Sequence, residues 1–209
     1  MKPAIQLAQY ANGLYGWSGF HAQWKIDFNS YAVKTPDGVA LIDPMKPGPS
    51  VLRKLDTLGT PIGIFLTTAH HDRDADWFRK HYGIQIYAHE KAQSDCDTKI
   101  DVLALDGEEL PGGLKVVPLP GASPGSVAFH LKLAGGIVMV GDSILHLRGK
   151  GLSLLPAQYL ENIRQTRQSL KTLLDLTFKI LTFAHGAPLT EDAKRQLGDF
   201  LKKPKGSKS

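Results

Sequence analysis

Short apolar segments separated by glycine, proline and polar residues make up the first part of the chain. Residues 29–34 and 39–43 are two such segments, and the sequence Thr-Pro-Asp-Gly joins them at residues 35–38. Proline presets φ and glycine permits a positive φ, so the joining sequence predicts a tight reversal of the chain. We therefore expect the two apolar segments to pair as a β-hairpin.

Helical and strand-like spacings alternate along the rest of the chain. The pattern predicts helices over residues 50–58, 74–82 and 158–174, with Ser50 as the cap of the first, and a last helix that begins near residue 190. The expected strands cover residues 62–67, 84–88, 100–105, 114–119, 127–133, 137–140 and 178–183. A β-rich half followed by helices, more strands and a closing helix predicts two sheets with helices outside them.

Polar residues follow four of the predicted strands at the point where each strand ends. They are His70, His71, Asp72 and Arg73 after residues 62–67, Ser123 after 114–119, Asp142 after 137–140, and His185 after 178–183. Ligand sites in layered α/β proteins tend to lie outside the carboxyl ends of strands. We therefore expect these side chains to converge on one rim of the molecule.

These loops resemble the metal-binding motifs of the metallo-β-lactamase superfamily. Residues 68–73 resemble its His-x-His-x-Asp-His signature, and residues 120–126 resemble its Gly-His-Thr/Ser-Pro-Gly loop. Gly141 and Asp142 match the loop with the bridging aspartate, and residues 184–186 match the loop with the last histidine. The resemblance implies the four-layer αβ/βα sandwich of this superfamily, an α/β (α+β) fold shared with the glyoxalase II-like hydrolases.

The resemblance also implies a degenerate metal site. Thr68, Ala122 and Arg73 stand where the family has histidine, so the first metal would lose two ligands and the second would lose one. The positions that keep a possible ligand are His70, Asp72, Asp142 and His185. A dinuclear site is therefore not expected.

The retained residues allow two arrangements. In one, a single divalent ion of zinc, iron or manganese is held by all four retained ligands. In the other, no metal is bound and the Arg73 guanidinium lies between Asp72 and Asp142 as a bidentate donor. We favour the arginine, because two unit charges ~4 Å apart cost roughly 4 kcal/mol at an effective dielectric of 20 and an ion beside Arg73 would be repelled.

Two classes of function follow from the resemblance. The first is hydrolysis of an ester, thioester or similar acyl bond, by metal-activated water or with a histidine as general base and Arg73 stabilising negative charge. The second is a non-catalytic small-anion binding or regulatory module in which Arg73 replaces the metal. The candidate catalytic residues are His70, His71, Asp72, Arg73, Asp142 and His185.

Some of these residues also have a structural interpretation. The two adjacent histidines could cap the following helix, and Asp72 could be its N-cap residue. His146, Arg148 and Lys150 lie in a glycine-containing stretch after Asp142. For that stretch we favour a solvated hairpin, and an anion contact for the substrate is the alternative.

Charge and composition narrow the expected partners. The net charge of +5 falls to +1 without the four lysines of residues 202–209. We therefore expect one domain over residues 1–201 and a basic, disordered tail over 202–209, and we expect no nucleic-acid partner. A small-molecule substrate or anion is the expected ligand.

The remaining composition bears on the class of protein and on its expected location. The content of 42% apolar and 22% charged residues fits a globular protein, and no apolar run is long enough to span a bilayer. Cys96 is the only cysteine, so an internal disulfide is excluded. We expect a cytoplasmic location and no membrane partner.

Overall fold

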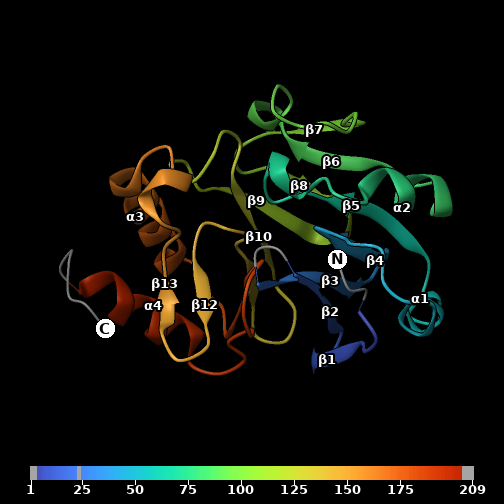
Figure 1. Ribbon diagram of the computed structural model, residues 1–209, viewed down its shortest axis with the longest axis horizontal. Coiled ribbons are helices and arrows are strands. Elements are labelled where there is room, and N and C mark those ends of the chain that lie inside the picture. Colours follow the sequence, from blue (N-terminus) through green and yellow to red (C-terminus); the bar gives the residue numbers. More distant parts are fainter. Residues whose placement is uncertain (1–3, 23–24, 204–209) are drawn as a thin grey trace.

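The computed structural model describes residues 4–22 and 25–203 and contains two sheets that face each other (Figure 1). The first sheet has seven strands in sequence order: β1 (Ala8–Ala11), β2 (Leu14–His21), β3 (Ile26–Thr35), β4 (Gly38–Ile42), β5 (Pro61–Phe65), β6 (Ile86–His89) and β7 (Val102–Ala104). Pairs up to β3–β4 are antiparallel, and the pairs from β4 to β7 are parallel. Four neighbouring parallel strands, β4 to β7, therefore end at the same edge.

The second sheet has five strands. Their order is β14 (Ile180–Thr182), β11 (Ile137–Met139), β10 (Val127–Leu131), β9 (Leu114–Pro118) and β8 (Glu109–Leu110). A separate hairpin of β12 (Leu145–Leu147) and β13 (Gly151–Ser153) follows β11 in the chain. Apolar side chains from both sheets fill the space between them, and the Phe65 ring stacks on Tyr87 and meets Phe129 edge to face.

Helices cover the two outer faces. Helices α1 (Pro49–Asp56) and α2 (Ala75–Tyr82) share an apolar cluster with the outer face of the first sheet, while α3 (Ile163–Thr172) and α4 (Ala193–Lys202) do so with the second. Figure 1 shows the two pairs of helices on opposite sides of the sheets. The predicted four-layer αβ/βα sandwich is confirmed.

Hydrogen bonds join the two sheets where their strands end. The Val127 amide donates to the Thr67 carbonyl at 2.9 Å, and the Asn29 amide donates to the Ala184 carbonyl at 2.8 Å. The Tyr31 hydroxyl donates to the Phe183 carbonyl at 2.8 Å. These bonds fix the loop after β5 to β10 of the second sheet and the loop after β14 to β3 of the first sheet.

Most predicted elements are present, and two predicted helices differ at their starts. The predicted hairpin is formed by β3 and β4. The first helix is capped by Gly48 with Pro49 in its first turn, not by Ser50, because proline is favoured where backbone donors have no helical partner. The predicted helix over 158–174 is wrong at its start, since α3 begins at Ile163 after the Asn162 side chain accepts two backbone N–H groups. The prediction also missed β1 and β2.

The C-terminal end only partly overlaps the described residues. Helix α4 extends through Lys202, one residue beyond the predicted domain boundary. Residues 204–209 of the predicted basic tail lie outside the described residues. Within the described ranges, every helix is too short or too polar to cross a bilayer.

Candidate functional site

A buried histidine lies between two carboxylates at the edge where the parallel strands end. His71, which is 1% exposed, places Nδ1 2.9 Å from Asp43 Oδ2 and Nε2 3.0 Å from Asp142 Oδ2. Asp43 follows β4 and Asp142 follows β11, so the contact joins the two sheets. Thr67 supports Asp43 by donating its amide to Oδ1 at 2.8 Å and its hydroxyl to Oδ2 at 2.6 Å.

The two carboxylates favour the protonated form of His71. Burial and the charge of Arg73 lower the pKa of His71, but Asp43 and Asp142 outweigh them and the pKa is raised overall. A carboxylate oxygen accepts and cannot donate, so both ring nitrogens carry a proton when both contacts are hydrogen bonds. The position between two acids therefore favours the imidazolium form of His71.

His185 approaches the same aspartate from the other side. Its Nε2 lies 3.2 Å from Asp142 Oδ1, and its Nδ1 donates to the Asp27 carbonyl at 2.7 Å. The Phe28 ring meets the His185 imidazole edge-on at a centroid distance of 4.7 Å. Burial acts to raise the pKa of Asp142, but His71 and His185 outweigh it and hold that pKa well below the ordinary value.

Arg73 supplies a second cation beside these acids. Its guanidinium lies over the Phe28 ring, 4.5 Å from the centroid, and its Nη1 and Nη2 atoms are buried without a hydrogen-bond partner among the described residues. Burial lowers the pKa of Arg73, and the charges of Asp43 and Asp142 oppose that shift. The predicted bidentate link from Arg73 to Asp72 and Asp142 is not formed, because His71 takes the bonding position on Asp142.

The structure places Asp72 and His70 outside this cluster. Asp72 Oδ2 accepts the Thr98 amide at 2.9 Å and lies 3.5 Å from Cys96 Sγ, so the side chain holds the loop after β6. Residues Ala69–His71 form a 3₁₀ turn, in which successive side chains are about 120° apart. Hence His71 is buried while His70 is exposed, and the four predicted ligands of a single ion do not come together.

Hydroxyl groups occupy the side of the site where two family histidines are replaced. Thr68 Oγ1 lies 2.8 Å from Ser123 Oγ, which lies 2.8 Å from Ser126 Oγ. Ala122, beside them, is buried. These neutral groups bond to one another and carry no charge for a cation to neutralise.

Sequence reasoning missed Asp43 as a member of the cluster. The signal was available, because Asp43 is a charged residue directly after the apolar segment 39–42, like the other residues that follow strands. The cluster that the structure assembles has five members: Asp43, His71, Arg73, Asp142 and His185. We call this set the charge cluster.

The charge cluster does not fit the metal that the resemblance implies. A catalytic zinc site uses three protein ligands and a water. Both nitrogens of His71 face carboxylates, which leaves Asp142 Oδ1 and His185 Nε2 as the donor atoms that point at each other. Across residues 4–22 and 25–203, three or more His, Cys, Asp or Glu side chains never gather in a group that could hold a metal ion. The Arg73 cation next to the two remaining donors further disfavours one.

Comparisons with known proteins agree with the fold. Residues 8–197 match the model of the metallo-beta-lactamase superfamily. The uncharacterized protein YobT of Bacillus subtilis (strain 168) is 26% identical over an alignment that covers 90% of this chain and 98% of YobT.

Two solved structures show the same architecture with metal bound. The mono-zinc form of the metallo-beta-lactamase FIM-1 from Pseudomonas aeruginosa has a TM-score of 0.76 at 15% identity, over 96% of this chain and 95% of FIM-1. The di-iron-bound form of TTHA1623 has a TM-score of 0.63 at 26% identity, over 78% of this chain and 89% of that protein. Because the family model matches residues 8–197, the chain belongs to the metallo-beta-lactamase superfamily.

Proposed function

We propose that this chain is a metal-independent member of its superfamily that binds a small anionic ligand and does not hydrolyse acyl bonds. The observation that carries the proposal is His71, held between Asp43 and Asp142 with Arg73 beside them. Two protein cations here balance the acids that a metal would otherwise balance. The charge cluster is thus complete without an ion.

The hydroxyl that contacts His71 is already engaged: Thr67 Oγ1 lies 3.0 Å from His71 Nδ1 but donates to Asp43 Oδ2 at 2.6 Å. Both ring nitrogens of His71 and of His185 already face an acid or a carbonyl. The Ser123 hydroxyl contacts other hydroxyl groups, whereas an activated serine needs a base within hydrogen-bond reach. This arrangement favours binding over catalysis.

The unsatisfied groups of the charge cluster suggest what the ligand carries. Buried polar atoms in native proteins nearly always have a partner, so Arg73 Nη1 and Nη2 call for an acceptor that the described part of the chain does not supply. A carboxylate or phosphate oxygen, or a water that relays to one, meets that requirement. The ligand class is therefore a small anion.

Metal content and turnover together test the proposal. Protein purified without a histidine tag should contain substoichiometric zinc, iron and manganese by elemental analysis. It should show no ester or thioester turnover with added Zn²⁺, Mn²⁺ or Fe²⁺ beyond that of the Asp142→Asn variant. A stoichiometric ion, or a turnover that Asp142→Asn abolishes, would overturn the proposal.

Acyl-bond hydrolysis with one divalent ion is the second candidate. It is favoured by a single observation, the 3.2 Å approach of His185 Nε2 to Asp142 Oδ1, an oxygen that is buried and makes no aligned hydrogen bond within the described residues. That ion would still need a third protein ligand. The same metal analysis separates the two candidates.

A further inference from the structure

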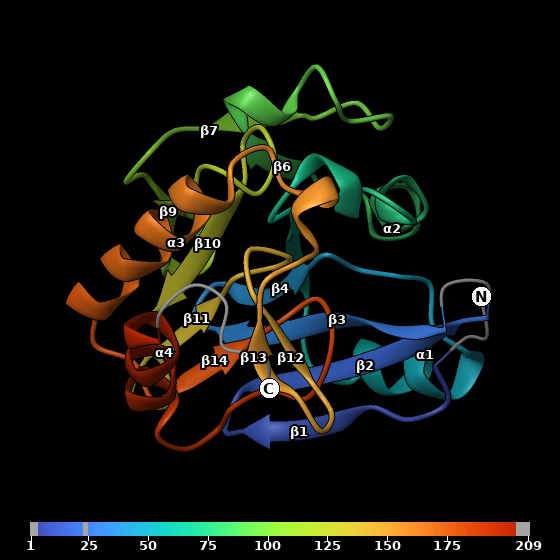
Figure 2. The same ribbon diagram turned by 60° about the vertical axis from the view of Figure 1, so that its left-hand side comes forward.

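A groove lies directly behind His185, between the β12–β13 hairpin and the first sheet. Figure 2 shows the hairpin crossing over β2 and β3 toward β1. The cavity measures about 590 Å³, within the range of small-molecule sites. Its lining residues include Tyr10, Ser18, Asp27, Asn29, His146 and Arg148.

Hydrogen bonds hold the floor of the groove in place. Asn29, which is buried, donates from Nδ2 to the Phe183 and Gly186 carbonyls at 2.9 and 2.6 Å. Its Oδ1 accepts from the Ser18 hydroxyl at 2.7 Å. Both ends of the Asn29 amide are thus engaged within the protein, which fixes the floor of the groove.

The hairpin wall is tied to the loop that carries His185. The His146 amide donates to the His185 carbonyl at 3.2 Å, and His146 Nδ1 lies 2.7 Å from the Ala187 carbonyl. The Asp27 carbonyl on the sheet wall accepts from His185 Nδ1. Both walls therefore contact the charge cluster through one residue, and the groove is preformed.

The groove carries two opposite charges that have no partner. Asp27, from β3, and Arg148, from the turn between β12 and β13, both line it and both are exposed. No hydrogen bond or ion pair of either side chain is found within residues 4–22 and 25–203. Each is therefore available to a ligand without breaking a contact.

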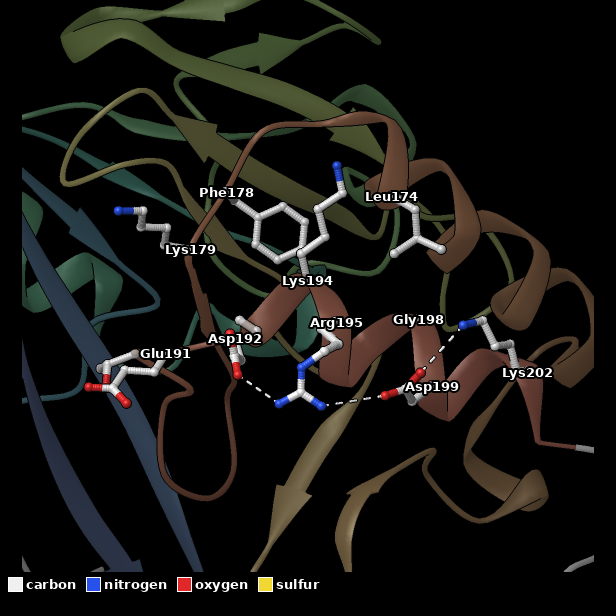
Figure 3. A pocket seen from close by; sticks show the side chains of 12 residues that line it. Leu174, Phe178, Lys179, Glu191, Asp192, Lys194, Arg195, Gly198, Asp199 and Lys202 are labelled. Atoms are coloured by element: carbon white, nitrogen blue, oxygen red, sulfur yellow. Dashed lines mark hydrogen bonds and ion pairs between the residues drawn. The ribbon is translucent and has the colours of Figure 1, made fainter.

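A larger hollow elsewhere in the molecule has a row of paired charges along one helix. It measures about 1010 Å³ and lies beside α4. Along that helix Arg195 contacts Asp192 at 2.7 Å and Asp199 at 3.7 Å, and Lys202 contacts Asp199 at 3.4 Å (Figure 3). The row of charges along α4 is satisfied internally, as is usual for a solvated helix face, whereas Lys179 and Glu191, which also line the hollow, make no side-chain ion pair within the described residues.

We infer that the groove binds a small zwitterion of amino-acid or dipeptide size, with its ammonium at Asp27 and its carboxylate at Arg148. This inference goes beyond the function proposed above, because Arg73 does not line the groove and the zwitterion is a different ligand from the anion proposed for Arg73. Guanidinium recognises a carboxylate through two parallel hydrogen bonds, and a carboxylate accepts from an ammonium group. The Tyr10 ring and the Leu147 side chain add an apolar lining for the ligand's side chain.

Calorimetric titration with three matched probes tests the inference. Glycyl-L-leucine carries both charges, N-acetyl-glycyl-L-leucine lacks the ammonium, and glycyl-L-leucine amide lacks the carboxylate. We expect saturable binding of glycyl-L-leucine and a loss of affinity of about ten-fold or more for each blocked probe, since a charge-assisted contact contributes roughly that much.

Two variants assign the groups. The Asp27→Asn variant should no longer distinguish the dipeptide from its N-acetyl form, and Arg148→Gln should no longer distinguish it from its amide. Lys150→Gln, a change in the same turn outside the groove lining, should bind as the wild type does, and thermal unfolding checks that all variants are folded.

Absence of saturable binding of glycyl-L-leucine up to about 10 mM would overturn the inference, because such affinity is weaker than even millimolar recognition. Equal binding by both variants would also overturn it. Either result leaves the metal analysis unchanged, so failure of the groove and failure of the metal-free function can be told apart.

Discussion

The two halves of the candidate site differ in how their side chains are balanced. On one side, the His71 and Arg73 side chains place positive charge beside Asp43 and Asp142. On the side of Thr68 and Ser123, charge is absent and hydroxyl groups bond to one another. One half thus pairs its acids with protein cations, and the other half carries no charge.

The difference shows which half of the site depends on counter-charges. Acids at the ends of strands stay buried, so each must have a counter-charge or its desolvation cost is uncompensated. Replaced histidines leave no charge behind, and small hydroxyl or methyl side chains fill their places. The charged half should therefore carry most of the stability of this region.

Removal of His71 should give the largest effect. His71→Ala leaves the buried Asp43 carboxylate, 5% exposed in its side chain, without its cation. Breaking a buried pair by removing one partner costs about 3–5 kcal/mol. Urea denaturation at neutral pH measures the loss in the free energy of unfolding.

The double variant serves as its control. Adding Asp43→Asn to His71→Ala removes the unpaired charge, so part of the lost stability should return. If His71→Ala alone lowers the free energy of unfolding by less than Ser123→Ala does, the contrast between the two halves is wrong.

A change of pH should remove part of the stability that His71 and Asp142 contribute. The pKa of folded His71 is raised, so its stabilising effect is complete below its ordinary pKa of about 6.5 and is lost as the pH rises through the raised value. The pKa of folded Asp142 is lowered, so its effect is present above about 3.9 and is lost as the pH falls through the lowered value. The free energy of unfolding should therefore be largest between these two limits.

Equilibrium unfolding over a pH series measures this profile. The His71→Gln variant should lose the decline on the alkaline side, and Asp142→Asn should lose the decline on the acid side. An unchanged alkaline decline in His71→Gln would show that another group causes it.

Conversion of Arg73 to histidine should restore a weak metal site. The imidazole introduced by Arg73→His removes the repelling cation and adds a donor near Asp142 Oδ1 and His185 Nε2, which reaches the ligand number of a catalytic zinc site. Zinc affinity measured by competition with a chelating dye should rise by about ten-fold or more over the wild type. Arg148→His, a matched change in the groove, should leave it unaltered; an equal rise there would mean that zinc binds nonspecifically.

The sequence predicts the architecture better than the contacts of the site. Hydrophobic spacing and the turn at residues 35–38 are local features, and they predict the β3–β4 hairpin and most other elements. The rim on which the loops gather follows from strand order. Both the elements and the rim can be predicted from short-range sequence patterns and from the resemblance to the family.

The partners within the site depend on geometry that the spacing does not carry. The 3₁₀ turn at Ala69–His71 decides whether His70 or His71 points inward. The sequence pattern does not predict this turn. The sequence predicts Asp72 as a member of the site, but its carboxylate accepts a hydrogen bond from the Thr98 amide, which belongs to a later loop of the chain. Such long-range competition between donors is decided only when the loops are packed.

Disruption of the hydroxyl half should have the smallest effect. Ser123→Ala removes the hydroxyl that lies between Thr68 and Ser126, at 2.8 Å from each, but leaves no buried charge unpaired. A neutral hydrogen bond contributes about 1 kcal/mol, so the free energy of unfolding should fall by about that amount and show no added dependence on pH. Urea denaturation of Ser123→Ala beside Ser50→Ala, whose exposed hydroxyl makes one contact of 3.5 Å, measures the difference. A loss equal to that of His71→Ala would mean that the neutral half supports the fold as strongly as the charged half, because only a tightly coupled polar network gives so large an effect from one hydroxyl.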